Sequence, residues 1–168
     1  MNDSTAPDPD PGIGSVLGRV VSGVYVLTAS NGAGHETGML ASWVQQAAFS
    51  PPLVTVAVNR SRYLNDWLSE HPFCVLNVIS ESQKELLRHF GRGFEPDAAA
   101  FDGIECNRSE QGLPILSDSL GYLECRSIQQ IEAGDHFVYV LEILNGAPGP
   151  RLDSESPMVH IRKNGFGY

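Results

Sequence analysis

Residues 38–64 read GMLASWVQQAAFSPPLVTVAVNRSRYL, with polar and basic side chains on both sides of one apolar run. The β-branched residues at 53–58 predict a buried strand. Proline cannot donate a ladder hydrogen bond, so we expect Pro51 and Pro52 at the start of this strand. There they should keep the preceding loop out of the sheet and hold it at a barrel end.

The segment NRSRY at 59–63 follows this strand and leads into a predicted helix. Unpaired N–H groups at a helix start favour an anion, and Arg60 and Arg62 add positive charge. These features indicate a site for a monophosphate. The alternative interpretation is that Ser61 only caps the helix and both arginines are solvated.

The rest of the chain alternates strand and helix signals and then returns to strands. Runs of β-branched and aromatic residues predict strands at 23–30, from 36, at 52–59, at 72–79, on both sides of Ala133-Gly134-Asp135, and near the C-terminus. Helical spacing predicts helices at 13–23, 61–72 with Ser61 as cap, and 80–91 with Ser80 or Ser82 as cap. Residues 92–114 lack periodicity and are expected to form an excursion outside the core. The pattern predicts a mainly β fold with peripheral helices, arranged as a closed or nearly closed antiparallel barrel.

Composition limits the classes of function. The 168 residues are 42% hydrophobic, enough for one globular domain, which we place at 13–168. Residues 1–12 are proline-rich and acidic and predict a disordered tail. The net charge of -9 argues against nucleic acid or anionic membrane as a partner. Without a membrane helix or signal peptide in this sequence, we expect a cytoplasmic protein.

Cysteines and histidines give no metal pattern. Cys74 and Cys125 lie inside apolar runs and are expected to be core thiols. The three cysteines lack CxxC spacing and the five histidines are dispersed, so we expect no metal site.

Several blocks occur in an order and spacing that carry a resemblance: SGVYVLTAS, GMLASWVQQAAFSPPLVTVAV, FCVLNVIS, LLRHFGRGF, LPILSDSLGYLEC, GDHFVYVLEI and VHIRKNGFGY. Together they resemble the flavin reductase-like, FMN-binding split-barrel family over roughly residues 13–168. The resemblance is to the flavin reductase domain of cyanobacterial-type flavodiiron proteins in particular. It implies a Greek-key-like antiparallel split β-barrel that forms a homodimer, binds FMN, and takes a hydride from NADH or NADPH.

The resemblance also implies the site residues. The segment from Met39 to Trp43 would line the flavin ring and ribityl chain, 59–63 would hold the phosphate, and the stretch from Phe90 would approach from the other side. The implied cofactor-binding set is Met39, Leu40, Ala41, Ser42, Trp43, Gln46, Asn59, Arg60, Ser61, Arg62, Tyr63, Phe90 and Arg92. This sequence departs from the commoner family pattern at Leu40, Gln46 and Ala48, where hydroxyl residues are frequent.

His136, in the GDH block, would lie at the nicotinamide face and is the implied catalytic residue. The alternative is an edge-strand histidine bonded to a neighbouring carbonyl. A C-terminal tail with His160, Arg162 and Tyr168 could fold over the mouth of the pocket, although a solvated end is the ordinary outcome.

Three functions follow from this interpretation. The first is an NAD(P)H-dependent flavin reductase that supplies reduced flavin or electrons to a redox protein or flavin-dependent enzyme. The second is an electron-transfer flavoprotein that holds FMN tightly and is reduced by a protein partner. The third is a non-redox binding module, against which the polar segment 59–63 argues.

Overall fold

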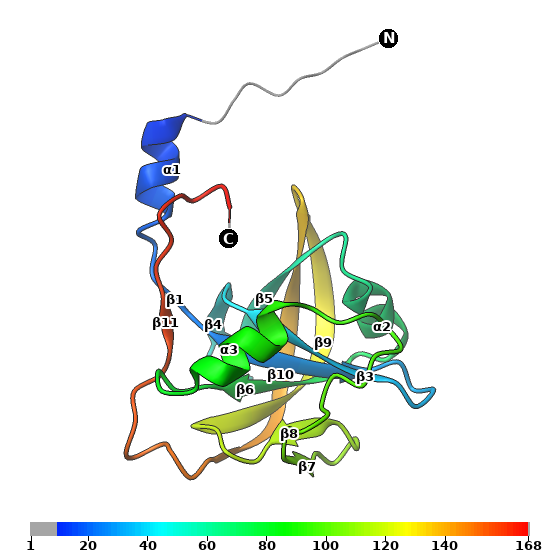
Figure 1. Cartoon of the computed structure of the whole chain (residues 1–168). Coiled ribbons are helices and arrows are strands. Elements are labelled where there is room, and N and C mark those ends of the chain that lie inside the picture. Colours follow the sequence, from blue (N-terminus) through cyan, green and yellow to red (C-terminus); the bar gives the residue numbers. More distant parts are fainter. Residues whose placement is uncertain (1–9, 168) are drawn as a thin grey trace.

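Antiparallel strands are the main secondary structure of residues 10–167, the part of the chain described by the computed structural model (Figure 1). Seven strands form one sheet in the order β3-β2-β6-β9-β10-β5-β4, and each neighbouring pair is antiparallel. Their bounds are β2 Tyr25–Ser30, β3 Glu36–Ala41, β4 Val44–Ala48, β5 Leu53–Asn59, β6 Phe73–Val78, β9 Gly121–Ala133 and β10 His136–Pro148. The predicted mainly β fold with peripheral helices is confirmed.

The sheet curls so that its two ends meet without pairing. The edge strands β3 and β4 are consecutive in the chain, and β3 comes into contact with β5 although no ladder joins them. Apolar side chains of β2, β3, β5, β6, β9 and β10 fill the space inside the curled sheet. This arrangement fits the predicted split barrel, with the split lying between β3 and β5.

The segment before the proline pair belongs to the sheet, contrary to our expectation of a loop outside it. Residues Val44–Ala48 form β4 and pair with β5, while Pro51 and Pro52 lie at the turn between the two strands. Because β4 lies at the edge of the sheet, exposed polar side chains such as Gln45 and Gln46 are tolerated on it. Because these two residues are polar, the segment lacks the alternation of apolar and polar residues from which a strand is predicted.

Two helices flank the split, and their starts differ from the predicted ones. Helix α2 (Leu64–Glu70) has Tyr63 rather than Ser61 at its N-cap, and it ends before Pro72 as predicted. Helix α3 (Lys84–Gly91) has Gln83 at the N-cap position. The predictions that Ser61, Ser80 or Ser82 caps a helix are therefore wrong. Ser61 instead donates from its N–H and its hydroxyl to the side chain of Asn59 at 2.9 and 2.7 Å.

Both ends of the described chain form an arm that projects from the barrel (Figure 1). Helix α1 (Pro11–Leu17) is shorter than predicted, and β1 (Ser22–Gly23) pairs with β11 (Val159–His160). Backbone bonds from Gly165 to Gly14 and from Arg162 to Gly18 hold the two segments together. We call residues 11–23 and 159–167 the arm. Of the predicted tail, residues 1–9 lie outside the described residues, whereas Pro11 and Gly12 belong to α1.

The excursion at 92–114 is partly core, which corrects our expectation. Strands β7 (Cys106–Arg108) and β8 (Pro114–Leu116) form a small antiparallel pair, and Ala100 and Leu113 of the excursion are buried. Cys74 and Cys125 are buried opposite each other on β6 and β9, which confirms the prediction of core thiols. Within residues 10–167, no helix has both the length and the apolar character needed to cross a membrane.

Candidate functional site

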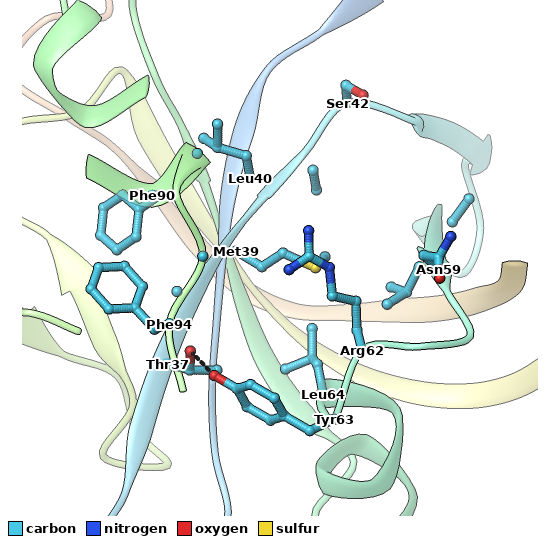
Figure 2. Close-up of a pocket in the computed structure, with 16 residues that line it drawn as sticks. Thr37, Met39, Leu40, Ser42, Asn59, Arg62, Tyr63, Leu64, Phe90 and Phe94 are labelled. Atoms are coloured by element: carbon cyan, nitrogen blue, oxygen red, sulfur yellow. Dashed lines mark hydrogen bonds between the residues drawn. The ribbon is translucent and has the colours of Figure 1, made fainter. Parts of the chain in front are cut away.

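A cleft of about 240 Å³ lies at the split of the barrel. Strands β3 and β5 form its two sides, and the start of α2 and the end of α3 close it (Figure 2). Its lining is Thr37, Gly38, Met39, Leu40, Ala41, Ser42, Ala57, Val58, Asn59, Arg62, Tyr63, Leu64, Phe90, Gly91, Gly93 and Phe94. Most of these residues are apolar or small, as in a site that accepts a flat organic ring.

Helix α3 approaches β3 closely because Gly38 has no side chain. A Cβ atom at Gly38 would lie 2.4 Å from Cε1 of Phe90, which is buried. Phe90 also packs edge to face with Phe94 at a centroid distance of 6.0 Å. The glycine therefore lets two aromatic rings form one wall of the cleft.

The cleft also contains a basic side chain, whose Nη1 would lie 3.3 Å from a Cβ atom at Gly93. Figure 2 shows Arg62 extending between β3 and β5 towards Met39. Arg62 is the one Lys or Arg among the described lining residues, and within residues 10–167 it takes part in no ion pair. Its guanidinium is therefore available to an anion.

Tyr63 ties the start of α2 to β3. Its hydroxyl lies 2.7 Å from the hydroxyl oxygen of Thr37, a buried residue on β3. Its ring packs against Trp67 with centroids 5.1 Å apart, and Trp67 is buried. This bond fixes the width of the cleft beside Arg62.

The two arginines of NRSRY have different surroundings. Arg60 forms an ion pair with Glu132 at 3.0 Å, and its guanidinium lies 4.7 Å from the ring centroid of Phe137. It does not line the cleft, and neither does Ser61. The monophosphate interpretation therefore depends on Arg62.

His136 lies beside the cleft without lining it. It is 5% exposed and stands opposite Asn59, a lining residue, in the register of β10 and β5. Its Nδ1 donates to Asp135 at 2.7 Å, and this bond lowers the pKa of Asp135. Its ring lies 4.8 Å from that of Trp43, over which the Arg162 guanidinium lies at 5.1 Å.

The structure thus brings together part of the predicted site. The predicted residues that line the cleft are Met39, Leu40, Ala41, Ser42, Asn59, Arg62, Tyr63 and Phe90. Those outside the lining are Trp43, Gln46, Arg60, Ser61, Arg92 and His136. Gln46 is exposed on β4, and Arg92 stacks on Phe94 at 4.9 Å.

Other lining residues were missed by sequence reasoning. They are Thr37, Gly38, Ala57, Val58, Leu64, Gly91, Gly93 and Phe94. Gly38 could have been found, since a glycine inside a strand pattern often marks a close approach. Phe94 ends the block LLRHFGRGF, so the resemblance could have indicated it, although the aperiodic stretch after α3 gives it no periodic pattern.

The structure is that of a mainly antiparallel β protein with a cleft at the split of a curled sheet. Residues 17–167 match the model of the flavin reductase like domain. The chain belongs to this family, which confirms the predicted resemblance and makes the chain a flavin-related oxidoreductase domain.

Two similar curated proteins are diflavin flavoproteins of Synechocystis sp. Diflavin flavoprotein A 3 is 41% identical over 153 residues, which are 90% of this chain and 25% of that protein. Diflavin flavoprotein A 1 is 37% identical over 160 residues, which are 95% of this chain and 27% of that protein. The chain thus spans about a quarter of the length of these relatives.

Similar solved structures are flavin enzymes and their components. The NADH:FAD oxidoreductase SgcE6 of Streptomyces globisporus is 26% identical with a TM-score of 0.79, covering 88% of this chain and 86% of that one. A homologue of nitrilotriacetate monooxygenase component B from Mycobacterium thermoresistibile is 25% identical with a TM-score of 0.78, covering 89% and 80%.

Proposed function

We propose that this chain is an NAD(P)H-dependent flavin reductase that binds FMN in the cleft at the barrel split. The observation that carries the proposal is one cleft that combines an aromatic wall at Phe90 and Phe94 with the Arg62 guanidinium, which forms no ion pair within residues 10–167. The aromatic wall fits the flat ring of FMN, and the guanidinium fits its terminal phosphate. Bound there, FMN would accept at its N5 a hydride from C4 of the nicotinamide.

The edge of β3 supports this assignment. β3 ends the sheet, so the backbone N–H and C=O groups on its outer side have no strand partner. They border the cleft through Thr37 to Ala41. Unpaired edge groups of this kind bind polar atoms of a ligand well, and the pyrimidine half of a flavin offers both donors and acceptors.

The choice of FMN over FAD rests on Arg62. One guanidinium suits a terminal monophosphate, which carries more charge per group than the diester-type phosphates of FAD. The similar structure from Streptomyces is an NADH:FAD oxidoreductase, so FAD is the competing ligand. Comparing the affinities for FMN, FAD and riboflavin tests this choice.

His136 and Trp43 border the same cleft, and we assign the nicotinamide to their side. The carboxylate of Asp135 accepts from Nδ1 of His136, and this bond holds the orientation of the imidazole ring. A hydride transfer needs orientation of two rings more than proton transfer. In this proposal His136 orients the nicotinamide.

The experiment is an anaerobic titration of the FMN-loaded protein with NADH and, separately, NADPH, followed by the flavin absorbance. Bleaching at a rate that saturates with the nicotinamide supports the reductase and identifies the donor. Flavin that stays bound and oxidised points to the second candidate, an electron-transfer flavoprotein reduced by a protein. The net charge of -9 favours that candidate, because an acidic surface attracts a basic redox partner. Failure to bind any flavin contradicts both.

We further propose that the chain acts as a homodimer. The arm exposes large apolar side chains, of which Val16 is 70% exposed: Ile13, Val16, Leu17, Val20, Val21, Val159, Ile161 and Phe166. The cleft, at about 240 Å³, is also smaller than the roughly 300–1,000 Å³ of complete small-molecule sites. A second copy would cover the arm and could complete the cleft, and light scattering after gel filtration measures the mass directly.

A further inference from the structure

We infer that Asn65 is a positioning residue that holds the segment 59–62 in the conformation that presents Arg62 to the cleft. This inference rests on the proposed function, because it concerns the end of the cleft assigned to the phosphate. Asn65 lies in the first turn of α2 and is 7% exposed, although it is polar and next to a surface loop.

The side-chain amide of Asn65 donates hydrogen bonds to backbone carbonyls of this segment. Its Nδ2 donates to the carbonyl of Asn59 at 2.9 Å and to that of Arg62 at 2.8 Å, and the Arg60 carbonyl lies 3.4 Å away. Asn59 and Arg62 are the two residues of the segment that line the cleft. One buried side chain therefore fixes the backbone at both points where the segment enters the site.

The orientation of that amide is set from the barrel core. The hydroxyl of Tyr139, which is 2% exposed on β10, donates to Oδ1 of Asn65 at 2.9 Å. Because backbone carbonyls can only accept hydrogen bonds, Nδ2 must face them, and Oδ1 then accepts from the Tyr139 hydroxyl. Burial raises the pKa of Tyr139 to about 12, so its hydroxyl keeps its proton over the pH range of ordinary assays. The path from Tyr139 through Asn65 thus links the core to the backbone of Arg62.

The rest of the segment offers little alternative support. Arg60, Ser61 and Arg62 are exposed, and α2 has no side-chain cap at Tyr63. The other contacts of the segment are backbone bonds from Arg62 to Asn59 at 3.1 Å and from Arg60 to Asp135 at 3.0 Å, the bonds from Ser61 to the Asn59 side chain, and the exposed Arg60–Glu132 ion pair. Among the described residues, Asn65 alone bonds the carbonyl of Arg62 from a buried side chain. Without Asn65 the segment should sample several conformations, and Arg62 would lose the preorganisation that lowers the entropic cost of binding.

The test compares FMN with riboflavin, which has the same ring and no phosphate. For Asn65→Ala we expect FMN to bind about tenfold more weakly, from the loss of several bonds that preorganise the segment. Riboflavin affinity should change by less than about twofold, since the ring contacts lie elsewhere. Tyr139→Phe, which removes only the hydroxyl, should weaken FMN binding about threefold and guards against failure of the first variant to fold.

Asn77→Ala is the matched control. Asn77 is also a buried asparagine whose side chain bonds two backbone groups, the Val26 carbonyl at 3.1 Å and the Leu116 N–H at 2.8 Å. It does not line the cleft, so this variant should lose stability without losing the preference for FMN over riboflavin. A similar loss of preference in both variants would show a general effect of destabilisation and overturn the inference.

Hydrogen exchange of the flavin-free protein separates this inference from the proposed function. In Asn65→Ala the amides of 59–63 should exchange faster, while those of β6 should not. Unchanged exchange at 59–63 overturns the positioning role whether or not flavin binds. If the wild-type protein ignores FMN while exchange responds as expected, the proposed function fails and the positioning role stands.

Discussion

Replacing Arg62 by alanine tests the site most directly, because this side chain carries the positive charge of the cleft. The guanidinium extends between β3 and β5, and no carboxylate within residues 10–167 neutralises it. If FMN binds as proposed, Arg62→Ala removes the charge-assisted hydrogen bonds to the phosphate. It leaves the aromatic wall at Phe90 untouched.

The magnitude follows from the exposure of Arg62. Hydrogen bonds to a charged group contribute about 1.5–3 kcal/mol. Since Arg62 is exposed, solvent screening places it in the lower part of this range, at about 1.5–2 kcal/mol. This corresponds to a roughly 10- to 30-fold increase in the Kd for FMN. The increase should shrink as salt is added, because screening already weakens the wild-type contact.

The assay is titration of the apoprotein with FMN and with riboflavin, monitored by flavin fluorescence. Arg60→Ala is the matched control: it removes the same charge two residues away, from a side chain paired with Glu132 outside the cleft. We expect its Kd for FMN to stay within about twofold of wild type. Equal losses in both variants would refute the local contact and leave only a general effect of net charge.

Three further predictions concern packing, thiol reactivity and turnover. Gly38→Ala should lower the free energy of unfolding in urea by about 1–3 kcal/mol, because its Cβ would meet Phe90 at 2.4 Å; Gly167→Ala, with open space around it, should change little. With a thiol reagent, Cys106 alone should react in the folded protein, and all three cysteines after denaturation. Because burial raises the pKa of Cys106 above that of an ordinary thiol, its rate should keep rising with pH beyond the point at which a small exposed thiol levels off. His136→Ala should lower turnover with the nicotinamide and preserve the Kd for FMN, and unaltered turnover would remove His136 from the site.

Much of the fold could be predicted because its signals are local. The β-branched run at 53–58 became β5, and the turn at Gly134-Asp135 joins β9 to β10 as expected. The end of α2 before Pro72 was also predicted. In each case a short run of residues contains both the element and its boundary, so no distant contact is needed to recognise it.

The roles of the two arginines in NRSRY could not be separated in this way. Arg60 and Arg62 are two residues apart in one turn, both are exposed, and either could have faced an anion. What distinguishes them is Glu132, which is 72 positions away and reaches Arg60 across the β9–β10 hairpin. Only the three-dimensional pairing shows which guanidinium is neutralised and which remains for a ligand.

The cleft itself depends on a choice of strand partner that is invisible in the sequence. After Ala41 the chain could have continued alongside β3 and closed the barrel, but β4 pairs with β5 and leaves the outer side of β3 unpaired. The exposed Gln45 and Gln46 gave no apolar alternation to reveal that strand. The pairing of β4 with β5 leaves open the split that contains Arg62 and the aromatic wall. The hardest strand to predict is therefore the one that creates the site.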